Sequence, residues 1–418
     1  MTMESVRTSI TRRQAMSVAG SMTASHSLSG VRADSTADRI RWWQQARFGM
    51  FIHWGIYALT GRGEWEMYTN HWPVAEYSRL ADRFQPRFYN PTEWVAIARD
   101  AGMKYVVLTT RHHDGFCLFD SRVSDFTSTR TAARRDLVAE YAEACHKAGM
   151  PMGFYYSLGS WRFPGLTEGK PVQDLSVYGE MVEQTHAQVR ELCTNYGKID
   201  ILWYDGAYPD QKIFRAAKLN AMVRRLQPHI LINDRSGQPE DFATPEGEVR
   251  AEKRPWEACI TMHSTWGYRP GERGYKPIPH LIALLCQASA LGGNLLLNVG
   301  PDADGRIPGP AIERLRAIGS WLRVHGEAIY GTTPFHTPHI YLGATARKGN
   351  KVYLMIHHMW PGSTVPFAWF PHRVQEACLL STGQKVRVEQ KGDRVWLHDL
   401  PENWPEPNVP VIALTIEE

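Results

Sequence analysis

A carboxylate at the end of a short apolar run is the strongest sign of chemistry in this chain. Apart from Asp200, residues 199–204 are apolar and mostly β-branched or aromatic, and glycines bound the run. This pattern is typical of a strand buried on both faces, and Asp205 follows it directly. Barrel and open-sheet enzymes place catalytic groups at the carboxyl ends of parallel strands, because the loops there converge on one crevice. An Asp can also cap the next helix, so the pattern alone leaves both roles open.

Polar and aromatic side chains also stand at or just after the ends of other predicted strands. If those strands form one barrel, their carboxyl ends face a single pocket. Taken alone, Arg235 is equally compatible with a surface charge and Glu246 with a solvated carboxylate. The pair His112 and His113 does not indicate a metal site, because adjacent residues of one strand point to opposite faces. The set comprises His53, Glu64, Trp65, His112, His113, Tyr155 or Tyr156, Trp203, Asp205, Arg235 and Glu246.

The combination of residue types in this set indicates one kind of chemistry more strongly than any single residue does. Two carboxylates, Asp205 and Glu246, accompany several His, Trp and Tyr side chains and one arginine. A glycosidase uses carboxylates as nucleophile and proton donor, polar side chains to bind sugar hydroxyls, and aromatic rings to stack on the sugar. The chain contains 15 Trp and 17 Tyr, which suits such a site as well as core packing. The residue types therefore favour glycoside hydrolysis.

The elements that must position these residues alternate along the chain. Strands are predicted at residues 48–55, 105–110, 152–157, 199–205, 230–235, 256–262 and 294–300. Helices between most of them are predicted at residues 91–102, 137–149, 181–196, 216–226 and 280–291. This α/β order predicts a TIM-like (β/α) barrel with one degenerate unit. An open doubly wound sheet is the alternative fold.

The spacing of apolar residues changes after Pro334. Apolar and polar residues then alternate with a period of two, and residues 385–397 have the signature of a hairpin with a turn at 391–393. We therefore expect a catalytic barrel over residues 34–335 and a small antiparallel β-sandwich over residues 336–418. The second domain is interpreted as a packing domain, with a sugar-binding module as the alternative.

The N-terminal segment resembles an export signal. Arg12 and Arg13 precede a weakly apolar stretch rich in Ser and Ala, and Val31-Arg32-Ala33 is a small-residue cleavage pattern. We expect residues 1–33 to be a twin-arginine signal, with a disordered tail as the alternative. The signal predicts a periplasmic or secreted protein, and the tail a cytoplasmic one.

The composition argues against several other classes of protein. The formal net charge of +4 is small and spread out, so it does not indicate nucleic-acid binding. The six cysteines include no CxxC pair, which favours buried free thiols over a zinc site or a disulfide scaffold. No later segment has the run of about 20 apolar residues that a membrane span needs. Nothing in the sequence sets the oligomeric state, and a homo-oligomer is compatible with it.

Several motifs occur together and in one order between Trp43 and Pro334. The motifs are Phe-Ile-His-Trp-Gly at 51–55, Gly-Glu-Trp at 63–65, His-His-Asp-Gly-Phe at 112–116, Tyr-Tyr-Ser at 155–157, Trp-Tyr-Asp-Gly at 203–206, Trp-Gly-Tyr at 266–268 and Gly-Asn-Leu-Leu-Leu-Asn-Val-Gly-Pro at 293–301. This set resembles the α-L-fucosidases of glycoside hydrolase family twenty-nine.

The resemblance implies retaining hydrolysis of terminal α-L-fucose from a fucosylated oligosaccharide or glycoconjugate, without a cofactor or a metal. It places the nucleophile on Asp205, which would form a covalent fucosyl ester. It favours Glu246 as the general acid/base, with Glu257 as the competitor, whose place at the start of a predicted strand suits packing. The resemblance assigns fucose binding to His53, Glu64, Trp65, His112, His113, Tyr156, Trp203 and Arg235.

Two other functions remain open at this point. A related barrel glycosidase for another sugar would keep Asp205 and Glu246 but change the residues around the methyl group of fucose. A non-catalytic carbohydrate-binding protein would retain the sugar without releasing a product. The presence of both carboxylates counts against the binding protein.

Overall fold

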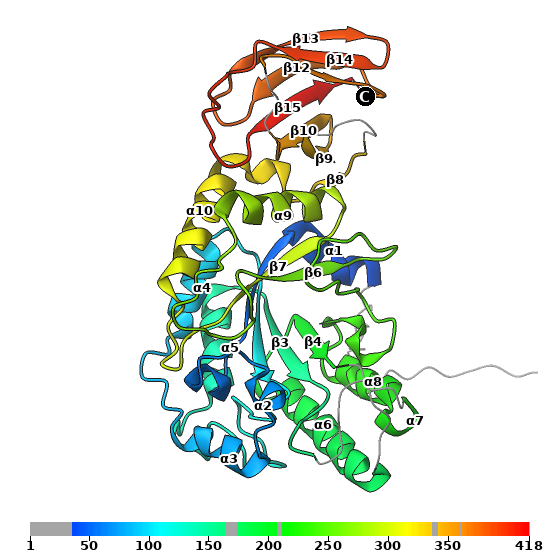
Figure 1. Cartoon of the computed structure of the whole chain (residues 1–418). Coiled ribbons are helices and arrows are strands. Elements are labelled where there is room, and N and C mark those ends of the chain that lie inside the picture. The colour runs from blue at the N-terminus through cyan, green and yellow to red at the C-terminus, as the bar shows by residue number, and fades with distance from the viewer. Residues whose placement is uncertain (1–35, 164–173, 207–210, 337–341, 359–361, 418) are drawn as a thin grey trace, which may run out of the picture. The chain divides into compact units, whose positions relative to one another are not determined.

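The computed structural model describes residues 36–163, 174–206, 211–336, 342–358 and 362–417 (Figure 1). The predicted export signal at residues 1–33 lies outside the described residues. Residues 34–418 form one compact unit with two sheets.

The first sheet contains seven parallel strands in the order β5-β4-β3-β2-β1-β7-β6. All seven lie where the sequence predicts a strand, so the predicted α/β barrel class is confirmed. The strands are β1 (Phe48–Ile52), β2 (Val106–Arg111), β3 (Met152–Ser157), β4 (Ile201–Asp205), β5 (Leu231–Ile232), β6 (Glu257–Thr261) and β7 (Asn294–Val299).

An irregular segment, residues 241–247, lies between the two edge strands of this sheet and is called the closing segment below. On the β5 side, the Asp241 N–H donates to the Ile232 carbonyl at 2.9 Å. On the β6 side, the Glu257 N–H donates to the Ala243 carbonyl at 2.9 Å. The segment thereby occupies the position of an eighth strand, which is the degenerate unit of the predicted barrel.

The strand residues alternate between two buried faces. Phe51 of β1 lies 5.0 Å from Trp203 of β4, measured between ring centroids. Because these strands are not neighbours in the sheet, their contact lies across the interior of the barrel. The interior cluster includes Phe51, Tyr105, Val107, Tyr155, Ile201, Trp203, Leu231, Cys259 and Leu296.

Helices connect most strands, and Figure 1 shows α5 and α6 beside β3 and β4. Asn90 and Asp136 cap α4 and α5, where each side chain accepts a hydrogen bond from a backbone N–H of the first turn. The helices are α1 (Thr36–Ala46), α2 (Glu66–Thr69), α3 (Val74–Ser78), α4 (Pro91–Asp100), α5 (Leu137–Ala148), α6 (Leu175–Asn195), α7 (Gln211–Phe214), α8 (Ala216–Leu226), α9 (Ile278–Ala290) and α10 (Gly309–His325), with short 3₁₀ turns η1 (Ile56–Leu59), η2 (Arg79–Asp82), η3 (Asp234–Ser236) and η4 (Gly326–Ala328).

The second sheet contains eight antiparallel strands in the order β11-β14-β13-β12-β15-β10-β9-β8. Strand β13 pairs at its start with β12 and along the rest of its length with β14, which forms the predicted hairpin. The strands are β8 (Thr333–Pro334), β9 (Gly343–Lys348), β10 (Lys351–Ile356), β11 (Val365–Phe367), β12 (Val374–Leu379), β13 (Lys385–Lys391), β14 (Arg394–His398) and β15 (Val411–Ile416).

One face of this second sheet contributes to the core beneath helices α9 and α10. The Trp321 indole of α10 donates to the Val409 carbonyl at 2.8 Å. Tyr353 and Met355 of β10 belong to the same apolar cluster as Leu285 of α9. These contacts favour the interpretation of the second sheet as a packing domain.

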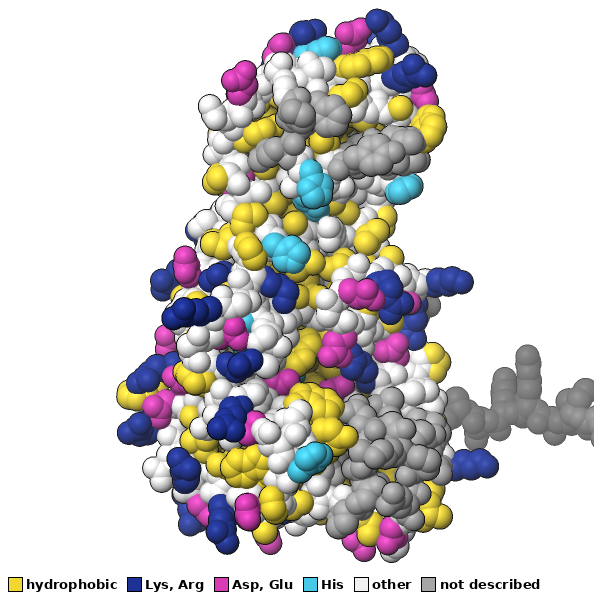
Figure 2. Space-filling view, in the orientation of Figure 1, with side chains coloured by type: hydrophobic (Ala, Val, Ile, Leu, Met, Phe, Trp, Pro, Cys, Tyr) yellow, Lys and Arg dark blue, Asp and Glu magenta, His cyan; other side chains and the backbone are white. Residues whose placement is uncertain are grey.

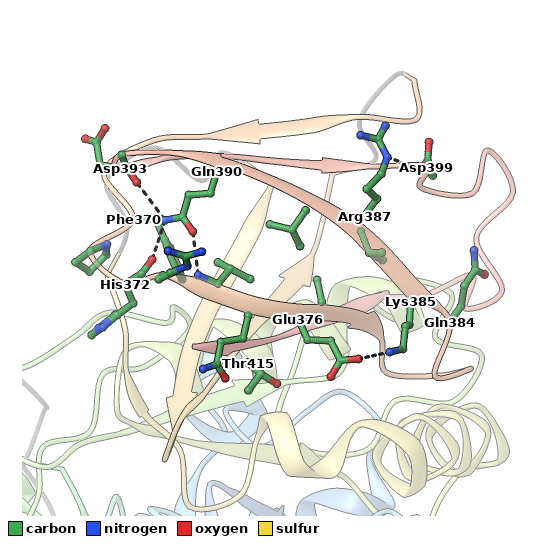
Figure 3. Close-up of a pocket in the computed structure, with 18 residues that line it drawn as sticks. Phe370, His372, Glu376, Gln384, Lys385, Arg387, Gln390, Asp393, Asp399 and Thr415 are labelled. Carbon is green, nitrogen blue, oxygen red and sulfur yellow. Dashed lines mark hydrogen bonds and ion pairs between the residues drawn. The ribbon is translucent and has the colours of Figure 1, made fainter. Parts of the chain in front are cut away.

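A cavity of about 1220 Å³ lies in the second sheet between β12 and β13 (Figure 3). Lys385 pairs with Glu376 at 2.8 Å, and Arg387 pairs with Asp399 at 2.9 Å. Glu376 and Asp399 therefore each lie beside a basic side chain of the cavity wall. Two of the carboxylates in this cavity wall are thus neutralised by basic side chains.

Figure 2 shows basic and acidic side chains intermingled on the face in view, without a large patch of one sign. Among the described helices, none combines the length and apolar character that a membrane crossing requires.

Candidate active site

Asp205 stands at the carboxyl end of β4, and its side chain is 19% exposed. The Tyr155 hydroxyl donates to Oδ2 at 2.7 Å, and the Arg235 guanidinium and the Gly206 N–H donate to Oδ1 at 2.9 and 2.8 Å. The His113 Nε2 lies 3.5 Å from Oδ2. Both carboxylate oxygens are thus held by groups that favour negative charge.

These contacts decide the protonation state of Asp205. Burial raises its pKa, but His113, Arg235 and the hydrogen bonds from Tyr155 and Gly206 lower it by more, so the pKa lies below its ordinary value. The carboxylate is therefore ionised at neutral pH, as a nucleophile must be.

Arg235 connects this carboxylate with a second one. It lies in η3, just after the short strand β5. Its NH1 donates to Asp205 and its NH2 donates to Glu246 Oε2 at 2.7 Å, while Nε donates to the Thr244 hydroxyl at 2.9 Å. Asp205 and Glu246 therefore lie at the two ends of one guanidinium.

Glu246 belongs to the closing segment, and its side chain is 47% exposed. Glu246 forms an isolated parallel β-bridge with Cys259, the central residue of β6. A carboxyl group in this place can meet both a sugar and solvent.

Glu257, the competing acid/base residue, occupies the other end of the sheet. It is the first residue of β6 and is fully buried. Its Oε1 accepts a hydrogen bond from the Trp203 indole at 3.1 Å, and its Oε2 accepts one from the Tyr105 hydroxyl. Burial raises its pKa to about 7, and the hydrogen bonds from Tyr105 and Trp203 oppose that shift. Glu257 thus lies in packing beneath the pocket, as its place in the sequence suggests.

Three buried histidines whose rings contact one another lie beside Asp205. His53 bonds through Nδ1 to the Asn298 amide oxygen at 2.7 Å, and His113 bonds through Nδ1 to the Ser157 hydroxyl at 2.6 Å. His112 stacks on the Tyr155 ring at 5.6 Å. Burial lowers the pKa of all three, to about 3 for His53. They are therefore neutral imidazoles, each with a donor and an acceptor nitrogen for polar partners.

Glu64 and Trp65 come from the loop after β1. Glu64 is buried, and its Oε2 accepts from the Gly267 N–H at 2.7 Å. Burial raises the Glu64 pKa above its ordinary value. The Trp65 ring lies 5.5 Å from His113 and 5.2 Å from Trp161. Both predicted residues thus lie at the same end of the barrel as Asp205.

An apolar wall lies beside the nucleophile candidate. The Trp203 ring stacks on Tyr155 at 5.7 Å with an angle of 16° between the rings. Trp266 lies 5.9 Å from Phe51 and 4.9 Å from His53. Phe51, Tyr155 and Trp203 are buried, whereas Trp266 is partly exposed, so Trp266 offers an aromatic surface on which an apolar part of a sugar can pack.

The geometry was compared with known proteins. The family model described as Alpha-L-fucosidase matches residues 18–327, more than half of the chain. The human plasma α-L-fucosidase is 32% identical over 419 aligned residues, which cover 87% of this chain and 88% of that protein. The chain belongs to the α-L-fucosidase family.

Solved structures of fucosidases share the fold. An α-L-fucosidase from Paenibacillus thiaminolyticus is 36% identical with a TM-score of 0.85, covering 92% of this chain and 100% of that chain. A family GH29 α-L-fucosidase from Bacteroides thetaiotaomicron, captured as a covalent intermediate with a 2-fluoro-fucosyl fluoride, is 26% identical with a TM-score of 0.83, covering 92% of this chain and 97% of that chain. The likeness therefore extends over both sheets of this α-L-fucosidase family member.

One predicted sugar-binding residue of this fucosidase family member needs correction. The Tyr156 hydroxyl donates to Gln188 of α6 at 2.7 Å and accepts from Arg111 at 2.9 Å, so Tyr156 lies on the outer face of the sheet. Because strand side chains alternate, Tyr155 faces the pocket instead. The sequence left this register open, and the contact of Tyr155 with Asp205 decides it.

Sequence reasoning missed three other residues that contribute to the pocket. Phe51 stands two positions before His53, and this spacing on one strand places both on the same face. Trp266 lies in a quoted motif that received no role, and Asn298 lies in another. Strand periodicity counted back from His53 would have found Phe51, whereas Asn298 depends on the pairing of β1 with β7 and could not be found from the sequence.

His112, His113 and Asp205 also form a cluster whose ligand atoms lie within 4.8 Å of one another. A metal cation there would compete with Arg235, which already pairs with the Asp205 carboxylate at 2.9 Å. The arrangement therefore suits a charge-stabilised nucleophile better than a metal site, and the sequence-based expectation of no metal stays a prediction.

Proposed function

We propose that this α-L-fucosidase family member hydrolyses terminal α-L-fucose from fucosylated glycans with retention of configuration, and that Asp205 and Glu246 carry the reaction. The observation that supports this most directly is the single arginine that contacts both carboxylates, at 2.9 Å and 2.7 Å. Retaining glycosidases need two carboxyl groups about 5–5.5 Å apart, and two groups at the ends of one guanidinium suit that spacing.

In the first step, Asp205 attacks the anomeric carbon while Glu246 gives its proton to the leaving oxygen. This forms a fucosyl ester on Asp205 and releases the rest of the glycan. In the second step, Glu246 takes a proton from a water molecule while the water oxygen attacks the anomeric carbon. The ester bond to Asp205 breaks, which releases the fucose and restores both carboxyl groups. The partial exposure of Glu246 gives it access to the water that the second step consumes.

The neutral imidazoles and Glu64 would bind the sugar hydroxyls. The wall made by Trp266 and the buried rings of Phe51 and Trp203 would accept the methyl group of fucose. A related sugar with a hydroxymethyl group would bury an unpaired hydroxyl against these rings, which costs binding energy. This wall therefore favours fucose over the alternative sugar substrates.

The test uses p-nitrophenyl α-L-fucoside with the parent chain, Asp205→Gly and Glu246→Ala. We expect Asp205→Gly to lose activity by about 10³-fold or more, because it lacks the nucleophile. Glu246→Ala should be slowed and then accelerated by azide, which needs no base to attack the ester. An active parent with an unimpaired Asp205→Gly would refute the proposed roles, and an inactive parent that retains fucose would favour the binding protein.

We further propose that residues 1–33 direct export through the twin-arginine route, so that the mature enzyme begins near residue 34. Replacing Arg12 and Arg13 by Lys in the full-length chain should move the activity from the periplasmic to the cytoplasmic fraction of a bacterial host. An unchanged distribution of activity would contradict export by this route.

A further inference from the structure

Glu257 is a buried glutamate that the proposed reaction does not use. None of its surface is exposed, and its two oxygens accept hydrogen bonds from Trp203 and Tyr105. The Tyr105 oxygen in turn accepts from the Asn294 amide at 3.3 Å. Burying a carboxyl group is costly unless it is hydrogen-bonded, and both Glu257 oxygens have a donor. The role of Glu257 is therefore sought in the residues that it holds.

That role depends on what Trp203 touches above Glu257. The Trp203 ring stacks on Tyr155 at 5.7 Å, and the Arg235 guanidinium carbon lies 5.0 Å from the same ring. Tyr155 donates to one oxygen of Asp205 and Arg235 to the other. One indole ring thus contacts both side-chain donors to Asp205.

We propose that Glu257 is a positioning residue for the nucleophile. By accepting the Trp203 indole N–H, it fixes the plane of the ring, and the ring holds Tyr155 and Arg235 where they donate to Asp205. This role rests on the proposed function of Asp205 as the nucleophile. It also reassigns Glu257, because a residue that acts through Trp203 is not the acid/base.

The chemistry of the contacts explains why the position holds a glutamate. An indole and a phenol both offer a hydrogen to the same buried point, and a carboxyl group supplies an acceptor oxygen to each. A glutamine would keep one oxygen for Trp203 and could donate its amide to the Tyr105 oxygen. A methionine has a similar length but no comparable acceptor, so the ring would lose its anchor.

The test compares Glu257→Met with Glu257→Gln and the parent on fucosides whose leaving groups differ in acidity. For Glu257→Met we expect kcat to fall by about 10- to 100-fold by the same factor for every leaving group, since a displaced donor impairs the nucleophile. Azide should give no acceleration. With looser donors, the Asp205 pKa rises, so the acid limb of the kcat/KM profile should move to higher pH. Glu257→Gln should keep most of the parent's kcat, and the acid limb of its kcat/KM profile should lie near the parent's.

Glu66 offers a matched control, because it is also a buried glutamate that accepts an indole N–H, from Trp72 at 3.2 Å. It contacts neither Tyr155 nor Arg235. Glu66→Met should lower the melting temperature without moving the acid limb. If Glu257→Met behaves in the same way, its role is structural and the proposal fails.

A double-mutant cycle tests the route through the indole. Trp203→Phe removes the N–H, so adding Glu257→Met to it should cost little more activity. Full additivity of the two effects would overturn the proposal.

Azide acceleration of Glu257→Met, or a rate loss confined to poor leaving groups, would instead identify Glu257 as the acid/base. An inactive parent would sink the proposed function, whereas an active parent with an unmoved acid limb in Glu257→Met would sink this inference alone.

Discussion

Tyr155 and Tyr156 are adjacent residues of β3 with opposite surroundings. The Tyr155 hydroxyl donates to Asp205 inside the barrel, whereas the Tyr156 hydroxyl bonds to Gln188 and Arg111 outside it. Both side chains are fully buried, so exposure alone does not distinguish them. Their hydrogen-bond partners do, and they predict different consequences for the same substitution.

Removing each hydroxyl therefore gives a matched pair of variants. Tyr155→Phe should lower kcat by about 10-fold or more and raise the Asp205 pKa, because the carboxylate loses a donor. Tyr156→Phe should leave kcat near the parent value and reduce stability by about 1–3 kcal/mol, because Arg111 and Gln188 lose a buried partner. Steady-state kinetics and denaturant unfolding measure the two effects. The reverse pattern would restore Tyr156 to the sugar site.

At the residue scale, the sequence predicted the types of the site residues better than their orientation. Asp205 stands directly after a strongly apolar run, so its place at a strand end was readable. The choice between Tyr155 and Tyr156 required the register of β3, which depends on its pairing with β2 and β4. Long-range pairing of this kind leaves no mark in a single sequence.

At the scale of elements, β5 is the shortest strand of the parallel sheet. This strand has only two residues, and the pairing with β4 continues through the side chain of Asn233. Its amide oxygen accepts from the Tyr204 N–H at 2.9 Å, and its amide nitrogen donates to the Tyr204 carbonyl at 2.8 Å. Asn233 thus replaces a backbone partner one residue before Asp205.

Asn233→Ala should leave both backbone groups of Tyr204 buried without a partner. We expect a loss of about 2–4 kcal/mol in the free energy of unfolding, since each unsatisfied group costs about 1–3 kcal/mol. Denaturant unfolding of the parent and the variant measures it. A loss below about 0.5 kcal/mol would show that the strand end does not depend on this side chain.

The closing segment shows why the eighth unit was hard to predict. Residues 241–247 include Pro245 and lack a continuous apolar alternation, so they have no strand signature. Their backbone nevertheless pairs with both edge strands of the sheet. The seven regular strands were predictable from apolar runs, whereas this segment depends on partners on either side of it.

For the whole molecule, the buried histidines make stability depend on pH. Burial lowers the pKa of His53 to about 3 and also lowers those of His112, His113 and His325. Each has a lower pKa in the folded state than the usual value of about 6.5, so each takes up a proton on unfolding between those two values. These histidines therefore contribute stability that is full above about pH 7 and is lost as the pH drops below it. The raised pKa values of buried Glu64, Asp114 and Glu257 act in the opposite direction, and we expect the four histidines to outweigh these three carboxyl groups.

Scanning calorimetry from pH 8 to pH 5 should show this as a melting temperature that falls progressively below about pH 7. The lowered pKa of Asp205 acts in the same direction at still lower pH, because its stabilisation is lost as the carboxylate is protonated. A melting temperature that stays constant or rises down to pH 5 would contradict the expectation that the buried imidazoles dominate the pH dependence of stability.

For the second sheet, the sequence predicted the antiparallel strands but not their attachment to the barrel. The period-two alternation and the hairpin turn indicated an antiparallel domain, and β13 and β14 form that hairpin. Its attachment through Trp321 of α10 was not readable, because α10 itself received no prediction. The contact joins residues far apart in sequence, which local patterns do not report.

The central claim is that Asp205 forms a covalent bond to fucose, and one measurement tests it most directly. The purified chain would be treated with 2-deoxy-2-fluoro-α-L-fucosyl fluoride, and the digested protein would be examined by mass spectrometry. The fluorine at C2 slows both steps, whereas the fluoride leaving group speeds the first, so the ester accumulates. We predict one fucosyl adduct on the peptide that contains Asp205, and none in Asp205→Gly. An adduct on Glu246 or another residue, or full activity without any adduct, would contradict the account.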